Sequence, residues 1–381
     1  MAATAPPSRR PTLADVAARA GVSTALVSLA IRDVPGVSAS TRERILRVAE
    51  EIGYRPDTRA RLLRSSRSHL IGVSFGVQHA FHGDLVGGLY DAAEAAGYEL
   101  TLSAVTAHRD EQRAVASLLQ DRCEAMILLG PSASPGYLDE LANRIPLVVV
   151  ARSARGVDVV RTADDEGLQQ AVDHLVGLGH RRIAHIDGGR APGAAERRRG
   201  YRQVMQRHGL DNEIHVIAGG LTEEDGAAGA RALLAENSRP TAVAVFNDRS
   251  ATGVLDVART AGLSVPADLS VVGFDNSRLA RLSQFDLTTV AQDVEQLSAL
   301  AVARAIDRLD GNPIGRREQI IPPQLIIRST TSPPAGQQRI TQVDDWPTHP
   351  GSPGSPRIQG WRSGANDRRR HDSNADERAR T

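Results

Sequence analysis

The sequence predicts an α/β protein with an all-helical N-terminal head followed by a larger body of two subdomains built on parallel sheets. Residues 12–53 carry three short helical patterns, and residues 70–328 alternate β-branched runs with longer amphipathic segments. Strands that alternate with helices at this spacing favour parallel sheets with crossover helices. A chain of 381 residues has room for a small module and two packed subdomains, since domains usually run to about 100–200 residues.

The sequence divides into five segments by composition. They are a leader (1–11), a helical head (12–55), a basic connector (56–69), a body (70–332) and a tail (333–381). We expect the leader and the tail to be disordered, because they are rich in Pro, Ser and Arg and lack apolar periodicity. No run of about 18 apolar residues could span a membrane, and the N-terminus does not resemble a secretory signal. These observations predict a cytoplasmic, nucleoid-associated protein with no membrane partner.

Positive charge is concentrated near the N-terminus. The whole chain has a formal net charge of only +1, but residues 1–71 contain twelve arginines against six acidic residues. The chain has no lysine, and the guanidinium groups that replace it suit forked contacts with phosphate or guanine. A basic segment of this kind is an electrostatic footprint for nucleic acid.

Little in the sequence favours catalysis or metal binding. The single cysteine, Cys123, has no second Cys or His at metal-ligand spacing and is expected to be a small buried residue. A phosphate-binding loop of the Gly-x-x-x-x-Gly-Lys type is absent, since that loop needs a lysine. Adjacent acids such as Asp164-Asp165 cannot converge on one helical face, so we interpret them as helix caps or solvated positions. We therefore expect no enzyme, no metal and no cofactor.

The first two helical patterns have the marks of a helix-turn-helix. Thr12 begins a capping-box-like start for a helix from Leu13 to Ala20, and Gly21 ends that helix. Ser23 then caps a helix from Thr24 to Ile31. Two short helices joined by a turn that contains glycine predict the helix-turn-helix arrangement, in which the N-terminal residues of the second helix enter the major groove of DNA.

A third helix is expected to follow the pair. Ser38 or Ser40 starts it, it runs from about Thr41 to Ile52, and Gly53 ends it. The spacing alone also fits a small helical bundle with no role at DNA, so both interpretations stay open at this point.

The body is predicted from short apolar runs that alternate with amphipathic segments. The expected strands are Leu70–Phe75, Leu100–Ala104, Ala125–Leu129, Leu147–Val150, Arg182–Ile186, Ala242–Phe246 and Val271–Phe274. In open α/β sheets, ligands bind outside the carboxyl ends of the strands, so polar residues that follow these runs are candidates for a binding site.

The head resembles that of LacI-type transcriptional regulators nearly position for position. The matching residues are Thr12-Leu-Ala-Asp-Val-Ala-Ala-Arg-Ala-Gly-Val-Ser23, Leu26-Val27-Ser28, Val37-Ser38, Thr41-Arg42, Ile45, Gly53-Tyr54 and Pro56, followed by Ala60-Arg61-Leu62-Leu63 and Leu70-Ile71-Gly72-Val73. The resemblance implies a homodimer on a palindromic double-stranded DNA operator, with paired hinge helices from the connector in the minor groove. It also implies a periplasmic-binding-protein-like body that binds a small effector.

The resemblance assigns base reading to Thr24, Ala25 and Leu29. Leu29 departs from many relatives, which carry a polar or cationic residue there, so Arg32 is expected to take over some reading. Leu63 is expected to wedge between base pairs, with Ala60 allowing two hinge helices to approach closely, unless Leu63 is an ordinary core leucine. The other residues expected at the DNA are Thr12, Ser23, Ser28, Ser38, Thr41, Tyr54 and Arg59. Phosphate contacts are also expected from Arg55, Arg61, Arg64 and Arg67.

The body resembles sugar-binding periplasmic proteins over about residues 70–330. Its landmarks are His174-Leu175, Leu178-Gly179-His180, Arg197-Arg-Arg-Gly200-Tyr201, Asn247-Asp248, Val271-Val-Gly-Phe-Asp275 and Leu287-Thr288-Thr289-Val290. We expect Arg197, Asn247 and Asp275 to bind the effector, since a donor, an amide and an acceptor form a complementary set for sugar hydroxyls. The alternative is a surface salt bridge between Arg197 and Asp275. Phe81 is expected to stack on the ligand or to pack in the core. His79 and His82 lie on either side of it, but no carboxylate or Cys completes a metal set with them, so no metal site is expected there.

These features predict a transcriptional regulator, and specifically a repressor, whose operator affinity changes when a ligand closes the two subdomains. The ligand could act as an inducer or as a corepressor. Three other classes fit parts of the sequence. A solute-binding transport protein fits the body but not residues 12–63, a doubly wound enzyme lacks its phosphate loop, and an architectural DNA-binding protein would bind without sequence preference. The tail shows no heptad repeat, which favours a dimer over a tetramer.

Overall fold

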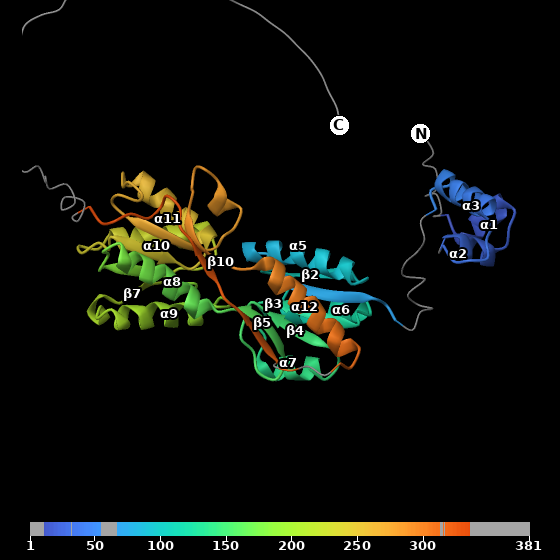
Figure 1. The fold of residues 1–381 in the computed structure, drawn as a ribbon, viewed down its shortest axis with the longest axis horizontal. Helices are drawn as coiled ribbons and strands as arrows, with labels where there is room; N and C mark the ends of the chain where they lie inside the picture. The colour runs from blue at the N-terminus through green and yellow to red at the C-terminus, as the bar shows by residue number, and fades with distance from the viewer. Residues whose placement is uncertain (1–10, 32, 55–66, 313–314, 316, 336–381) are drawn as a thin grey trace, which may run out of the picture. The chain divides into compact units, whose positions relative to one another are not determined.

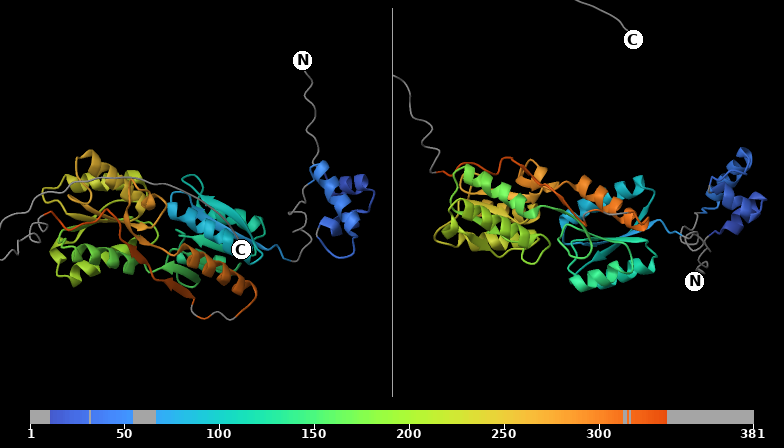
Figure 2. Two further views of the ribbon diagram at one scale, coloured as in Figure 1. Left: turned by 45° about the horizontal axis from the view of Figure 1, so that its top comes forward. Right: turned by 60° about the horizontal axis from the view of Figure 1, so that its bottom comes forward.

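The computed structural model describes residues 11–31, 33–54, 67–312, 315 and 317–335. Figures 1 and 2 show a helical head and a body with two lobes, each built around one sheet. The expected hinge helix and nearly all of the expected disordered leader and tail lie outside the described residues. Those expectations therefore stay predictions.

The head consists of three helices, α1 (Leu13–Ala20), α2 (Thr24–Ile31) and α3 (Ala39–Glu51). Thr12 forms the expected capping box: its hydroxyl accepts from the Asp15 N–H at 3.4 Å, and the Asp15 carboxylate accepts from the Thr12 N–H at 2.7 Å. Gly21 ends α1 with a φ of 66°, a left-handed conformation that glycine adopts without a Cβ penalty. The helix-turn-helix prediction is confirmed at both of its helices.

The third helix begins two residues earlier than expected. Ser38 rather than Ser40 is its N-cap, and the Ser38 hydroxyl accepts from the Thr41 N–H at 3.3 Å. All three helices bury small apolar side chains in one cluster, which contains Val16, Ala17, Ala20, Val27, Ala30, Ile45 and Ala49. Packing of this core, and not propensity, holds helices of only 8 residues in place, because such short helices are marginal alone.

Lobe 1 carries a six-stranded parallel sheet in the order β11-β5-β4-β3-β1-β2. Its strands are β1 (Leu70–Gly76), β2 (Glu99–Val105), β3 (Ala125–Leu129), β4 (Leu147–Val150), β5 (Asp158–Thr162) and β11 (Glu318–Ile321). Its helices are α5 (Ala80–Ala95), α6 (Glu111–Gln120), α7 (Pro135–Ala142) and α12 (Val294–Leu309).

Lobe 2 carries a second six-stranded sheet in the order β12-β10-β9-β8-β6-β7. Its strands are β6 (Ile183–Ile186), β7 (His215–Ile217), β8 (Ala242–Val245), β9 (Ser270–Asp275), β10 (Thr288–Ala291) and β12 (Gln324–Ile326), and only β12 runs antiparallel to its neighbour. Its helices are α8 (Asp164–Gly177), α9 (Ala194–Arg207), α10 (Glu223–Leu234) and α11 (Asp248–Thr260), with short 3-10 turns at Asp211–Glu213 and Leu279–Arg281.

Helices cover both faces of each sheet. Along β3, Ala125, Ile127 and Leu129 pack with α5 and α12, whereas Met126 and Leu128 pack with α6 and α7. In lobe 2, α10 and α11 cover one face and α8 and α9 the other. This two-sided burial explains why the strands are continuous apolar runs rather than alternating ones.

All seven strands expected from the sequence form, with ends shifted by at most one residue. The structure adds β5, β7, β10, β11 and β12, which sequence reasoning missed. These five are short, and β11 (Glu-Gln-Ile-Ile) and β12 (Gln-Leu-Ile) contain only two apolar residues each, so their apolar signal is weak.

Within the described residues the chain passes between the lobes at three places. It leaves lobe 1 after β5, returns between β10 and α12, and crosses again between β11 and β12. The first two crossings pass close to each other, because Thr162 donates a buried hydrogen bond to Gln292 at 2.7 Å. This bond connects the two crossings directly. We call this region between the lobes the hinge; it is distinct from the hinge helix expected in residues 56–69.

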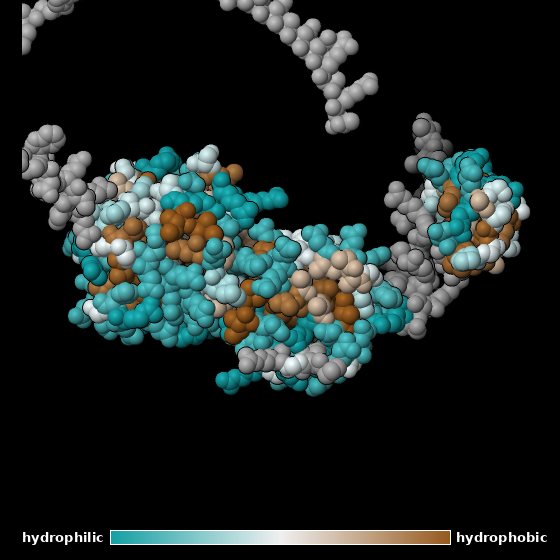
Figure 3. Space-filling model, in the orientation of Figure 1, coloured by the Kyte–Doolittle hydropathy of each residue, from teal (hydrophilic) through white to brown (hydrophobic). Residues whose placement is uncertain are grey.

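The surface in Figure 3 mixes polar and apolar residues on the face it shows. In the part of the chain that the structure describes, no single helix has the length and apolar character needed to cross a membrane. Among the described helices, α1 and α2 pass that test together, as a pair bent by 104°, and buried apolar residues of both belong to the core of the head.

Cys123 is buried, as expected, and its Sγ would lie 3.0 Å from a Cβ placed on Gly72. Burial raises the pKa of this thiol to about 11. Because the thiolate is the reactive form, we expect Ellman's reagent to label the native chain about 100-fold more slowly than the denatured chain. Equal labelling rates would show that Cys123 is accessible and that this region of lobe 1 opens easily.

Candidate functional site

The head exposes the start of α2. Ser23, Thr24 and Ala25 are exposed, while Ser28 and Leu29 are partly buried, since Val27 and Ala30 of the same helix fill the core. The sequence predicts Thr24 and Ala25 at base edges, and no described residue of the head covers them. The Leu29 side chain is partly buried, so only part of it is exposed for contact with a base.

Other residues expected at the DNA are already engaged within the head. The Thr12 hydroxyl donates to Asp15 at 2.6 Å, and the Ser38 hydroxyl donates to Thr41 at 2.8 Å. Tyr54 packs against the core, and its N–H donates to the Ala49 carbonyl at 2.8 Å. These polar groups are fixed by the helix ends that they stabilise, so a DNA contact from them would be a second role. Arg32, Arg55, Arg59, Ala60, Arg61, Leu63 and Arg64 lie outside the described residues.

Arg42 is a head residue whose role sequence reasoning missed. Its guanidinium pairs with Asp33 and donates to the Val34 carbonyl at 2.8 Å, so α3 holds the loop that follows α2. Its Nε is buried without a partner among the described residues. A motif match alone could not reveal this contact, because it joins residues eight and nine positions apart through a loop.

The sequence analysis expects Arg67 to contact a DNA phosphate, whereas in the structure its guanidinium contacts residues of lobe 1. Its guanidinium lies 3.3 Å from Glu124 and 3.3 Å from Asp310, and it donates to the Tyr98 hydroxyl at 2.6 Å. The next residue, Ser68, donates to the Arg122 carbonyl at 2.8 Å. All these partners belong to lobe 1, so this group of contacts fixes the first described residues of the body to that lobe.

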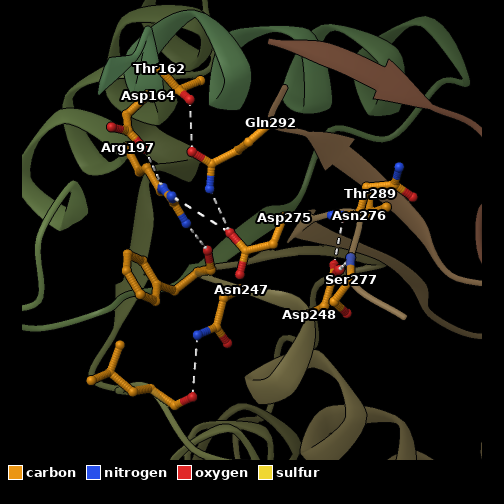
Figure 4. A network of polar contacts seen from close by, with 12 residues as sticks. Thr162, Asp164, Arg197, Asn247, Asp248, Asp275, Asn276, Ser277, Thr289 and Gln292 are labelled. Carbon is orange, nitrogen blue, oxygen red and sulfur yellow. Dashed lines mark hydrogen bonds and ion pairs between the residues drawn. The ribbon is translucent and has the colours of Figure 1, made fainter. Parts of the chain in front are cut away.

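Arg197 lies at the centre of a buried polar network in lobe 2 (Figure 4). Its Nε donates to Asp164 at 2.8 Å, its Nη1 donates to the Phe246 carbonyl at 2.5 Å, and its Nη2 lies 3.9 Å from Asp275. The guanidinium also lies over the Phe274 ring, 3.5 Å from the centroid. The Arg197 and Asp275 side chains are 6% and 8% exposed, so the surface salt bridge considered as an alternative is wrong.

Asp275 connects this network to the hinge. Gln292 donates to Asp275 at 2.8 Å and accepts from Thr162, so one chain of hydrogen bonds runs from lobe 2 to both crossings (Figure 4). Burial raises the pKa of the Asp275 carboxyl, and the nearby Arg197 cation opposes that rise. Asp275 has a φ of 114°, a conformation that is rare outside glycine.

Asn247 and Asp248 begin α11 and have separate partners. The Asn247 side chain caps the helix by accepting from the Ser250 N–H at 2.7 Å, and it donates to the Leu221 carbonyl at 3.2 Å. Asp248 is fully buried and accepts from the Thr289 hydroxyl at 2.5 Å and from the Ser277 N–H at 2.7 Å. The sequence analysis expected Asn247 at the effector, which stays a prediction, and gave Asp248 no role.

The two lobes enclose a cavity of about 550 Å³ at the carboxyl ends of their strands. Lobe 1 contributes Ser74, Gln78, His79, His82, Glu111 and Ser132, and lobe 2 contributes Arg190, Pro192, Thr222, Asp225 and two glycine pairs, Gly188-Gly189 and Gly219-Gly220. The His79 and His82 rings stack at 4.4 Å. No group of three His, Cys, Asp or Glu side chains among the described residues is arranged to hold a metal ion.

The four residues expected at the effector do not line this cavity as the structure describes it. Phe81 packs in the core of lobe 1, which was one of its two expected roles. Its neighbours His79 and His82 line the cavity instead. Arg197, Asn247 and Asp275 are buried beside the hinge. Their role at a ligand stays a prediction.

Two hydrogen bonds between described residues link the lobes around the cavity. Arg249 of lobe 2 donates to the Gln78 carbonyl of lobe 1 at 3.2 Å while it pairs with Glu223 at 2.6 Å. Ser153 of lobe 1 donates to Glu196 of lobe 2 at 3.0 Å. Relative movement of the lobes would have to break both contacts.

One stretch of lobe 1 has the spacing of a hydrolase nucleophile elbow, Gly72-Val-Ser-Phe-Gly76. Such an elbow needs a sharp turn from strand to helix at its serine. Ser74 instead lies inside β1, paired with Ser103 of β2, and it is 3% exposed. The spacing therefore does not make a nucleophile here.

Comparison with known proteins identifies both parts of the chain. Residues 12–57 match the family described as bacterial regulatory proteins, lacI family, and residues 172–331 match a periplasmic binding protein-like domain. The chain is 32% identical to the HTH-type transcriptional regulator DegA of Bacillus subtilis (strain 168) over 84% of this chain and 98% of that protein.

Solved structures agree with these matches over the head and the body. The lac repressor dimer bound to operator and the anti-inducer ONPF is 28% identical, with a TM-score of 0.75 over 85% of this chain and 100% of that chain. The transcriptional regulator CelR in complex with cellobiose is 27% identical, with a TM-score of 0.62 over 84% of this chain and 100% of that chain. Together with the helix-turn-helix head and the two-lobed body, these similarities show that the chain belongs to the LacI family of bacterial DNA-binding transcriptional regulators, which are not enzymes.

Proposed function

We propose that this regulator is a homodimeric repressor whose affinity for a palindromic operator is controlled by a small neutral sugar bound between its lobes. Its site of action is the bacterial cytoplasm, at the nucleoid. The observation that carries the proposal is the cavity of about 550 Å³, which both lobes line and which has polar groups on each side. A ligand that contacts both lobes changes the free energy of the closed arrangement relative to an open one.

The DNA-binding half of the proposal rests on the exposed start of α2. Thr24 and Ala25 are free to contact base edges, and the core beneath them fixes their position. Leu63 and the hinge helix are proposed to act in the minor groove, as the family resemblance implies. A dimer is proposed because the related lac repressor is a dimer on its operator.

The choice of a sugar rests on the chemistry of the cavity wall. Burial lowers the pKa of His79 to about 4 and of His82 to about 3, so both rings are uncharged at neutral pH. Neutral rings, hydroxyls and backbone groups of paired glycines suit a ligand with many hydroxyl groups. The related regulator in complex with cellobiose supports the same class.

The proposal is tested by titrating the full chain onto an operator selected from a pool of random duplexes. We expect tight binding to selected palindromes, and a change of at least tenfold in operator affinity when a panel of hexoses, pentoses, disaccharides and alditols is added, a typical allosteric coupling. A sugar that binds the chain but leaves operator affinity unchanged would contradict ligand control. Binding that depends only on salt and not on sequence would instead favour an architectural DNA-binding protein.

A further inference from the structure

On one wall of the cavity, Glu111 has a buried carboxylate oxygen that has no hydrogen-bond partner among the described residues. Glu111 lines the cavity from the first turn of α6 and is 9% exposed. Its Oε2 accepts from the Ser132 N–H at 2.8 Å, from the Ser132 hydroxyl at 2.9 Å and from the Ala133 N–H at 3.2 Å. Its Oε1 is buried and, within the described residues, has no hydrogen-bond partner. Buried polar atoms in folded proteins nearly always have a partner, and Glu111 lines the cavity, so a ligand in the cavity is the candidate partner for this oxygen.

His82 supplies a donor on the same cavity wall. It is 3% exposed, and its Nδ1 accepts from the Gly76 N–H at 3.2 Å. A ring nitrogen that accepts carries no proton, so the proton of the neutral imidazole is on Nε2. This nitrogen lies near Gly130, another cavity residue, since a Cβ there would be 3.1 Å from it. Burial and the neighbouring His79 lower the pKa of His82 to about 3, which keeps the ring uncharged at neutral pH.

We propose that Glu111 and His82 select the effector by its hydroxyl groups, with Glu111 Oε1 accepting from one ligand O–H and His82 Nε2–H donating to a ligand oxygen. This inference rests on the proposed function, and it assigns the selectivity for the effector to residues of lobe 1. A hydroxyl both donates and accepts, so a sugar or another polyol satisfies both groups. A phosphate or carboxylate at Glu111 would face a second acceptor with the same charge, and a deoxygenated ligand would leave Oε1 unpaired.

Glu111→Gln isolates this role of Glu111. Gln can keep an oxygen toward Ser132 and Ala133, which preserves the loop contacts, while it replaces the free acceptor with an N–H₂ donor. Asp110→Asn is the matched control, because it removes the same charge from the same end of α6. Asn is an equally good N-cap, and Asp110 does not line the cavity.

The experiment measures calorimetric binding of the full chain to the tightest sugar of the panel and to its monodeoxy analogues. We expect the native chain to lose at least tenfold in affinity for one monodeoxy analogue. Glu111→Gln should bind the parent sugar at least tenfold more weakly and no longer distinguish that analogue, whereas Asp110→Asn should behave as the native chain. His82→Phe, which keeps a ring but removes the donor, should lose discrimination at a second hydroxyl. Thermal melting of each variant shows that it is folded.

Each outcome bears on one proposal or the other. Unchanged binding and unchanged discrimination in Glu111→Gln would overturn the inference. If glucose 6-phosphate or adenosine binds and shifts operator affinity while no neutral sugar does, the inference fails but ligand control of the regulator stands. If a neutral sugar binds as expected at Glu111 yet operator affinity does not respond, the inference stands and the proposed control of DNA binding fails.

Discussion

Replacing Arg197 with methionine should destabilise lobe 2 by roughly 3–5 kcal/mol, because the change leaves buried carboxylates without their cation. Met keeps most of the length of the side chain, so the loss comes from charge and not from volume. Asp164 would lose its 2.8 Å partner, and Asp275 would lose the nearby Arg197 cation that opposes the rise in its pKa. Thermal melting followed by circular dichroism should show a fall in Tm on the order of 10 °C.

The pH dependence of Arg197→Met provides a second readout. Burial already raises the pKa of Asp164 and of Asp275 above the values of the unfolded chain, and loss of the cation raises them further. The folded state then binds protons that the unfolded state releases, so its stability falls as pH rises through the raised pKa values. We expect the difference between variant and native chain to narrow as pH is lowered from neutral toward 5.

Arg199→Met is the matched control for this variant. Arg199 is on the same helix and also pairs with an aspartate, Asp165, but the two side chains are 50% and 28% exposed. Such partly exposed pairs contribute little, about 1 kcal/mol or less. Equal losses in Arg197→Met and Arg199→Met would contradict a special role for the buried network.

Ala25→Asp should weaken operator binding by about 100-fold or more while leaving the fold intact. Ala25 is exposed at the second position of α2, so the substitution buries no charge in the head. On DNA, the carboxylate would meet phosphates and the acceptor-rich edges of the bases, and in a dimer the penalty occurs in both heads. Fluorescence anisotropy with the selected operator measures the loss.

Ala195→Asp controls for the change in net charge. Ala195 is exposed in the first turn of α9, far along the chain from the head, and an acidic residue is favourable at that end of a helix. We expect its operator affinity to stay within about twofold of the native value at fixed salt. If the two variants weaken binding equally, the start of α2 does not read DNA.

Much of the fold could be predicted because local signals and tertiary packing agree. The capping box at Thr12, the glycine at position 21 and the continuous apolar runs of β3 and β8 each point to the element that forms. The missed strands, such as β7 with only three residues, depend on partners far away in sequence for their hydrogen bonds.

The candidate site was less predictable, because its chemistry depends on burial. Asp164 was interpreted as a cap or a solvated residue, yet it is 4% exposed and pairs with Arg197 from a different helix. Glu111 follows an ordinary helix cap, and nothing in the sequence indicates that one of its oxygens is left without a partner beside a cavity. Phe81 and His82 are adjacent, and only the rotation of α5 decides which of them packs in the core and which lines the cavity.

The group of contacts around Arg67 has a practical consequence for protein engineering. Glu124, Asp310 and Tyr98 all come from lobe 1, so the body carries its own attachment point for the chain that enters it. A chimeric regulator that joins a foreign head to this body should therefore place its junction before residue 67. A junction placed after Ser68 would discard both anchoring residues, and the transplanted head would then be joined to the body without them.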